Sequence, residues 1–165
     1  YGLSRGVHAL QVMTRAPYLA EAVARCRADK HCLAAIDEIY REVDALFTRT
    51  GCDCRACGRC CRFDLMDHRL YASAGEIACL LERTTPPGSS PGVLRCPYHV
   101  EPHCRARAGR TLGCRTYFCY PPAAIQAGQE AYERFHRRLR ALHEKHGLPY
   151  LYVELTAALT DLLGL

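Results

Sequence analysis

Apolar residues recur at helical spacing along the first third of the chain and predict two amphipathic helices. The first covers residues 17–30 and begins at Pro17, a residue that favours the first turn of a helix. The second covers residues 33–49, where apolar positions at i, i+3, i+4 and i+7 alternate with charged ones, and Gly51 is expected to end it. We expect this second helix to act as a scaffold that leads the chain into a cysteine-rich segment.

The middle of the chain mixes short apolar runs with turn residues and predicts less regular structure. Residues 63–66 predict a short strand. Ser73 and Glu76 form an S-x-x-E capping box, which predicts the start of a helix. Residues 86–92 form a connector rich in proline and glycine, and residues 94–122 predict short irregular strands and loops.

The last quarter returns to a helical pattern. Residues 124–146 carry a stripe of aromatic and leucine side chains, and residues 150–155 predict a strand. Thr156 is expected to cap a last helix over residues 157–163. The whole pattern predicts a mostly α fold with short irregular β segments, arranged as a helical shell around a cysteine-rich metal-binding core.

Length and composition indicate a single domain. The chain has 165 residues, of which 49% are hydrophobic and 24% charged. We divide the domain 1–165 into a helical scaffold at 17–49, a cysteine-cluster metal-binding region at 52–121 and a C-terminal packing region of helix and strand at 124–165. No run of 18 apolar residues occurs, so we expect no membrane span. Residues 1–14 lack the pattern of a secretion signal, although the chain begins without Met and a trimmed segment is left open.

The positive charge is carried almost entirely by arginine. The net charge is +5, with 20 Arg and 2 Lys, and ten of the arginines lie between Arg55 and Arg115, among the cysteines. Metal-bound thiolates are anionic, so nearby arginines would offset their charge and donate hydrogen bonds to sulfur. Because the arginines are spread along the chain and form no single basic run, we do not expect a nucleic-acid partner.

Cysteine usage favours metal binding over disulfides. Ten of the twelve cysteines fall within residues 52–119. A disulfide framework would leave both flanks almost without cross-links, and the adjacent pair Cys60–Cys61 would form a strained bridge. We therefore expect bound metal ions and a reducing, cytoplasmic location. Cys26 and Cys79 lie on apolar helix faces and are expected to pack in the core.

Residues 52–61 hold five thiols in ten positions. Cys54, Cys57 and Cys60 repeat at intervals of three, the spacing of the run that holds an iron–sulfur cluster whose fourth ligand comes from elsewhere. Gly58 suits a tight backbone turn between these thiols. The spacing indicates a metal site but does not distinguish iron from zinc, because thiolates suit both metals.

Further cysteine elements follow this run: Cys-Pro-Tyr at residues 96–98, a single cysteine at 104 and Cys-Arg-x-Tyr at 114–117. With the Cys-x-x-Cys-x-x-Cys-Cys run, they resemble the CxxCxxCC, or YkgJ-like, cysteine-cluster family over residues 52–121. The resemblance implies a zinc- or iron-chelating protein, in a family whose biochemical role is mostly unassigned. Phe118-Cys119 stands where the family often has proline, and Cys52 adds a C-x-C start. Carried over to this chain, the family pattern marks as ligands Cys54, Cys57, Cys60, Cys61, Cys96, Cys104 and Cys114.

Eight thiolates, with Cys119 added, exceed what one mononuclear site holds, because zinc and a four-iron cluster each take four cysteines. Consecutive cysteines are expected to point apart, so Cys60 and Cys61 would face two sites. We predict either two four-thiolate sites or one polynuclear assembly. Arg115 and Tyr117 of the Cys-Arg-x-Tyr element are predicted to contact the cofactor. The predicted metal ligands are Cys54, Cys57, Cys60, Cys61, Cys96, Cys104, Cys114 and Cys119.

Three functions fit this pattern. The first is an iron–sulfur protein with a redox or cofactor role, acting with a redox or protein partner that the sequence does not identify. The second is a zinc-binding structural or interaction module, in which the metal holds irregular loops together. The third is metal storage or delivery. For the first, an aromatic shell would shield the redox centre, and its expected members are Phe63, Tyr98, Tyr117 and Phe118.

Whether the protein is an enzyme is left open by the sequence, which shows no phosphate-binding loop or nucleophile elbow. A redox reaction would need a positioned acid or base near the metal, and the nearest candidates are two tyrosines and two histidines. The three histidines of the helix predicted over residues 124–146 are expected on its surface or near its C-terminal end. The candidate acids and bases are Tyr98, Tyr117, His99 and His103, and the three helix histidines are His136, His143 and His146.

Overall fold

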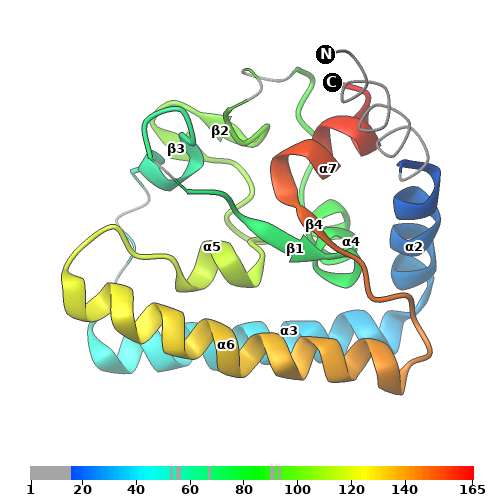
Figure 1. Cartoon of the computed structure of the whole chain (residues 1–165), viewed down its shortest axis with the longest axis horizontal. Coiled ribbons are helices and arrows are strands. Elements are labelled where there is room, and N and C mark those ends of the chain that lie inside the picture. Colours follow the sequence, from blue (N-terminus) through cyan, green and yellow to red (C-terminus); the bar gives the residue numbers. More distant parts are fainter. Residues whose placement is uncertain (1–15, 53, 55–56, 67, 90–91, 93) are drawn as a thin grey trace, which may run out of the picture.

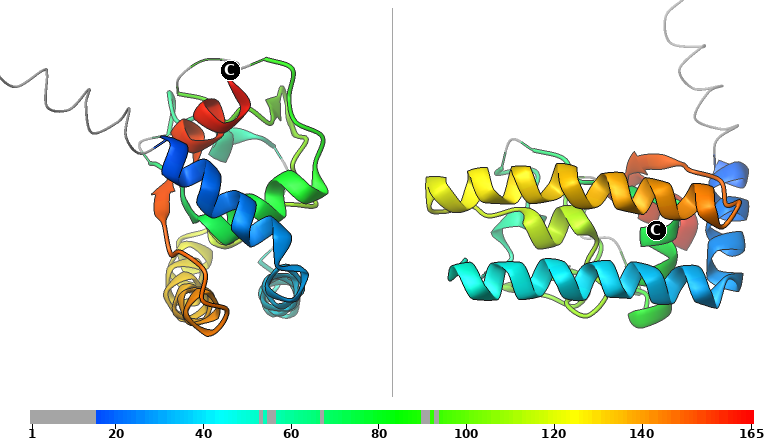
Figure 2. Two further views of the ribbon diagram at one scale, coloured as in Figure 1. Left: turned by 90° about the vertical axis from the view of Figure 1, so that its right-hand side faces the viewer. Right: turned by 90° about the horizontal axis from the view of Figure 1, so that it is seen from below.

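The computed structural model describes residues 16–165 except 53, 55–56, 67, 90–91 and 93. Two long helices, α3 (Lys30–Thr50) and α6 (Pro122–Lys145), run side by side in opposite directions along one edge of the molecule (Figures 1 and 2). The other elements pack on one side of this pair. Among the described residues, helices predominate and strands are short, which confirms the mostly α prediction.

Local signals in the sequence set the ends of these helices. Asp29 accepts a hydrogen bond from the Cys32 amide at 2.8 Å and caps the start of α3. Gly51 ends α3 in the left-handed conformation at φ 68°, as expected from its lack of a side chain. Helix α2 (Ala16–Ala28) precedes α3, and both lie close to the predicted ranges.

A second group of elements packs at the end of the molecule where α3 begins. Helix α4 (Ala74–Arg83) starts with the predicted capping box. The Ser73 hydroxyl accepts a hydrogen bond from the Glu76 amide, and the Glu76 carboxylate accepts one from the Ser73 amide. Strands β1 (Tyr71–Ser73) and β4 (Tyr152–Glu154) pair antiparallel, and α7 (Leu155–Leu163) follows directly. Its N-cap is Glu154, so the prediction of Thr156 as the cap is wrong.

The cysteine-bearing segments gather toward the other end, where α3 ends and α6 begins (Figure 1). They contain the 3-10 turn η1 (Arg59–Cys61), a hairpin of β2 (His99–Val100) with β3 (His103–Cys104), and helix α5 (Leu112–Thr116). Residues 63–66 form turns, so the strand predicted there is wrong. Helix α5 was not predicted, because its five residues are too few to show a helical period.

The hydrophobic core is continuous from α2 to the cysteine region. Ile36, Val43 and Leu139 are fully buried between the helices, and Tyr98 and Leu112 extend the core toward the thiols. Of the described helices, none is long and apolar enough to cross a membrane.

Candidate metal centre

Two cysteine segments distant in sequence are joined by backbone hydrogen bonds. The Cys96 amide donates to the Cys61 carbonyl at 3.0 Å, and the Asp64 amide donates to the Leu94 carbonyl at 3.1 Å. Between them lies an antiparallel bridge that pairs Arg62 with Arg95. These bonds place the end of the first cysteine run beside the start of the second.

Gly58 brings the first run against the β2–β3 hairpin. Its φ of 71° is left-handed, and a Cβ added there would lie 2.7 Å from both the His99 Nε2 atom and the Pro102 carbonyl oxygen. Only glycine fits this close approach without strain. The hairpin in turn pairs His99 with Cys104, so the tight approach helps to carry Cys104 to the same place as the first run.

Helix α5 delivers Cys114 through contacts with two other helices. The buried Glu76 carboxylate accepts a hydrogen bond at 2.8 Å from the Leu112 amide, at the first turn of α5. On the other side, Gly128 of α6 allows close packing, since a Cβ there would lie 2.0 Å from the Thr116 carbonyl oxygen. The short helix is therefore fixed by partners far away in the sequence, and the position of Cys114 depends on them.

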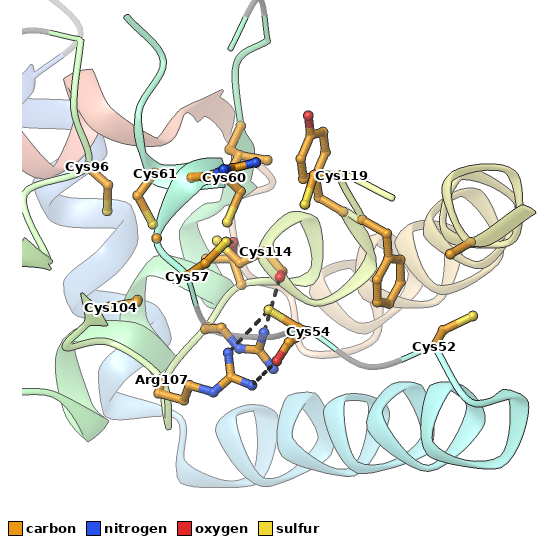
Figure 3. Close-up of a pocket in the computed structure, with 18 of the residues that line it drawn as sticks. Cys52, Cys54, Cys57, Cys60, Cys61, Cys96, Cys104, Arg107, Cys114 and Cys119 are labelled. Atoms are coloured by element: carbon orange, nitrogen blue, oxygen red, sulfur yellow. Dashed lines mark hydrogen bonds between the residues drawn. The ribbon is translucent and has the colours of Figure 1, made fainter. Parts of the chain in front are cut away.

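The converging segments enclose a cavity of about 1020 Å³ (Figure 3). All eight predicted ligand cysteines line it, and Cys52 does so as well. The four aromatic residues of the expected shell also line it. The structure thus brings the whole predicted set together around one space, although the thiols come from four segments. The nine cysteines of the wall are Cys52, Cys54, Cys57, Cys60, Cys61, Cys96, Cys104, Cys114 and Cys119.

Three of the other cysteines affect the titration of the buried Cys61 thiol. Interactions with Cys104, Cys60 and Cys96, together with burial, raise the pKa of the Cys61 thiol. The proton held by Cys61 stabilises the neighbouring thiolates, so the pKa is lowered to about 6 at Cys104 and to about 7 at Cys60. The expectation that adjacent Cys60 and Cys61 point apart is wrong, because both side chains line the same cavity (Figure 3) and each affects the pKa of the other.

Other polar groups contact the remaining sulfur atoms. The Thr111 hydroxyl donates to the Cys114 sulfur at 3.3 Å, while burial raises the pKa of Cys114 to about 12. Arg107 donates to the Cys54 sulfur at 3.4 Å and to the Cys54 carbonyl at 3.3 Å. The burial of the thiols differs widely: Cys61 and Cys96 are buried, whereas Cys57 and Cys119 are exposed.

The described part of the cavity wall carries positive charge and no carboxylate. Arg59, Arg107 and Arg110 line it, and among the described lining residues there is no Asp or Glu. This balance suits an anionic group inside. Arg115, predicted to contact the cofactor, is not among these lining residues. Its buried guanidinium pairs with Asp44 and lies over the Tyr40 ring, 4.4 Å from the ring centroid.

The candidate acids and bases separate into two groups. Tyr98 and Tyr117 line the cavity, and burial raises the pKa of both phenols. His99 is buried against Gly58, and His103 is exposed on the hairpin. Neither histidine is among the described residues of the cavity wall. Of the four candidates, only the two tyrosines could act directly on a group bound there.

Two histidines of α6 and its C-cap, and two cysteines of the core, have structural surroundings outside this region. His143 is fully buried in the last turn of α6, and its Nδ1 atom lies 2.9 Å from the Pro149 carbonyl, so of the two expected positions it takes the one near the C-terminal end and not the surface. His146 pairs with Asp29 at 2.9 Å. Cys26 and Cys79 are fully buried in the core, as predicted.

The donor chemistry of the cavity suits a thiophilic metal, but the sulfur atoms do not meet at one point. All twelve cysteines are free thiols, and nine of them share one wall. Within the described part of the chain, however, no three His, Cys, Asp or Glu side chains are arranged to hold a metal ion together. Binding would therefore have to draw thiols closer and remove their protons, including the one shared by Cys61.

Comparisons with protein-family models, with curated proteins and with solved structures found no match for the chain.

Proposed function

We propose that the protein is a cysteine-cluster metal-binding protein that carries an iron–sulfur centre with a redox or cofactor role. The observation that carries this proposal is the convergence of nine free thiols from four segments on one cavity. Packing does not account for it, because several of these thiols line open space or are exposed, unlike Cys26 and Cys79 of the core. The resemblance to the CxxCxxCC family points to the same chemistry.

The surroundings of the thiols support a charged, shielded centre. Arginines line the cavity, and Arg107 already donates to a cysteine sulfur. Aromatic side chains of the wall would limit access of water, and both features tune the potential of iron–sulfur centres. Such a centre supplies one-electron chemistry when bound. Tyr98 and Tyr117 would then be the groups of this chain best placed to hold a proton beside it.

A polynuclear centre is favoured by the number and placement of the thiols. Cys60, Cys96 and Cys104 affect the pKa of both Cys61 and Cys114 and lie with them on the same cavity wall. A single mononuclear zinc site takes four cysteines, so the other thiols of the wall would have no metal to bind. Free thiols throughout the chain agree with a reducing compartment, so we propose a cytoplasmic location.

Zinc is the second candidate, and the irregular backbone of the cysteine segments favours it. Between α3 and β1, and between α4 and α5, the described backbone forms one 3-10 turn, the bridge of Arg62 with Arg95 and a two-stranded hairpin, and no other regular element. Structural zinc stabilises loops of this kind. In that case the metal would hold the loops together and would carry no electrons.

Anaerobic purification followed by metal and acid-labile sulfide analysis tests the proposal. A brown protein with iron and sulfide supports the first candidate, whereas a colourless one with about two zinc equivalents refutes it in favour of the second. Cys57→Ser should lose metal and melt at a lower temperature. Cys79→Ser is the matched control, since Cys79 lies in the core beside the Leu33 carbonyl, which a serine hydroxyl can bind. Equal metal content in wild type and Cys57→Ser would refute this ligand assignment.

A further inference from the structure

His68 lies directly behind the cavity wall. Its ring stacks on Tyr117 with centroids 4.2 Å apart and planes 11° apart, and it meets Phe63 edge-on with centroids 5.1 Å apart. Both of these aromatic residues line the cavity, whereas His68 is not among the described residues that do. The histidine is therefore one layer removed from the thiols, held between two side chains that face them.

The ring nitrogens of His68 have no hydrogen-bond partner within the described structure. Both Nδ1 and Nε2 are buried, and neither forms a hydrogen bond there. Burial lowers the pKa of His68, and the nearby backbone groups of Cys60 and Met66 act in the opposite direction. Buried polar atoms without partners are rare in folded proteins and call for an explanation, such as a bond that forms when a site is loaded. A neutral imidazole has one N–H to donate and one nitrogen to accept.

We propose that His68 is a positioning residue for the metal centre, donating its ring N–H to the Cys60 carbonyl when the thiols close on metal. This inference rests on the proposed metal-binding function. Cys60 and Cys61 lie in η1, a single turn closed by a hydrogen bond from the Cys61 amide to the Gly58 carbonyl at 3.0 Å. So short a turn has little rigidity of its own. A hydrogen bond from His68 to the Cys60 carbonyl would fix the peptide group between the two neighbouring cysteines, Cys60 and Cys61.

Outer groups of this kind orient metal ligands, and their loss typically weakens metal binding about 10–100-fold. The stack of His68 on Tyr117 fixes the plane of the ring, and both ring nitrogens are buried away from solvent. The role therefore needs both features of the side chain. Its planar ring supplies the stack, and its N–H supplies the bond that phenylalanine cannot make.

Three variants separate the hydrogen bond from packing. His68→Phe keeps a stacking ring without a donor, and His68→Gln keeps a donor without a ring. His31→Gln is the matched control, because His31 is exposed on α3. Each variant of the full chain is prepared reduced and metal-free, titrated with Co²⁺, and followed by the thiolate-to-cobalt charge-transfer absorption. Thermal unfolding of the metal-free proteins is measured in parallel.

We expect His68→Phe to bind Co²⁺ about 10–100-fold more weakly than wild type, with metal-free unfolding unchanged. His68→Gln should lose less affinity, and the control none. Wild-type affinity in His68→Phe would overturn the proposal. A larger loss in His68→Gln than in His68→Phe, or an equal loss in the control, would do the same. If His68→Phe does not fold, His68→Leu replaces it, and failure of both to fold would show a core role and overturn the proposal.

Failure of the proposed function gives a different result. Wild-type protein would then develop no thiolate-to-cobalt band at all, and both proposals would fall together. If wild-type protein develops the band and the His68 variants bind Co²⁺ with wild-type affinity, only the proposed role of His68 is refuted.

Discussion

A single methyl group added at Gly58 should push the β2–β3 hairpin, which carries Cys104, away from the first cysteine run. Alanine at this position meets two obstacles: a left-handed backbone with φ 71°, and a Cβ position 2.7 Å from the Pro102 carbonyl oxygen. The same Cβ lies 2.7 Å from the His99 Nε2 atom. The carbonyl belongs to the backbone of the β2–β3 turn and cannot rotate aside as a flexible side chain would. The hairpin that carries Cys104 must therefore move away.

Each obstacle costs free energy of unfolding. Left-handed backbone costs a residue with a Cβ about 1–2 kcal/mol. Overpacking at a tight contact costs about 1–3 kcal/mol more. Gly58→Ala should therefore lower the free energy of unfolding by about 2–5 kcal/mol. That loss is a large part of the stability of an ordinary domain, about 5–15 kcal/mol.

Gly51→Ala provides the matched control for the backbone term. Gly51 also has a left-handed φ of 68°, but a Cβ there would meet nothing within 4 Å among the described residues. Urea unfolding of the reduced, metal-free proteins should show a loss of about 1–2 kcal/mol for Gly51→Ala. The difference between the variants isolates the contact with the hairpin. Co²⁺ titration should show weaker binding only for Gly58→Ala.

Equal stability of the two alanine variants would refute this reasoning. So would a Gly58→Ala protein that is destabilised as expected but binds Co²⁺ like wild type. The first result would mean that the hairpin does not press on Gly58, and the second that its position does not affect the thiols.

Two further predictions concern buried ionisable groups. Burial lowers the pKa of His143, so the folded protein excludes a proton that the unfolded chain accepts. The stability that His143 contributes should be fully present above about pH 6.5 and should fall below it by up to about 1.4 kcal/mol per pH unit. In urea unfolding of the metal-free protein, His143→Gln should therefore reduce the pH dependence over about pH 5–7, whereas His31→Gln, at an exposed position, should not. Glu76→Gln should lower the free energy of unfolding by about 1–3 kcal/mol, because one of the two carboxylate acceptors is lost and either the Ser73 or the Leu112 amide is left unbonded. Unchanged pH dependence in His143→Gln, or unchanged stability in Glu76→Gln, would contradict these two accounts.

The sequence predicts the long helices well because their signals are local. The capping box of Ser73 with Glu76 and the stop at Gly51 are both formed as expected. Helix α5 could not be predicted, because it depends on a carboxylate located 36 positions earlier in the chain. The cap of α7 was misplaced because Glu154 caps from the end of a strand, where an acidic residue gives no clear helix signal.

The thiol set could be predicted from spacing, but its surroundings could not. Cysteines are few enough in most chains that their clustering carries information by itself. Arg107 and Arg110 are two of ten arginines in the region, and nothing in the sequence distinguishes those that line the cavity. His68 likewise has no local signal, since its role depends on a stack with Tyr117, 49 positions later. Side-chain partners of this kind are set by tertiary packing.

The number of sulfur atoms bound to the metal provides the most direct test that both cysteine runs supply metal ligands. Extended X-ray absorption at the metal edge should show about four sulfur neighbours near 2.3 Å in wild type. Cys57→Ser, in the first run, and Cys104→Ser, in the second, should each lower the number of sulfur neighbours or release the metal. A first shell of only nitrogen and oxygen, or a sulfur shell unchanged in both variants, would contradict the account.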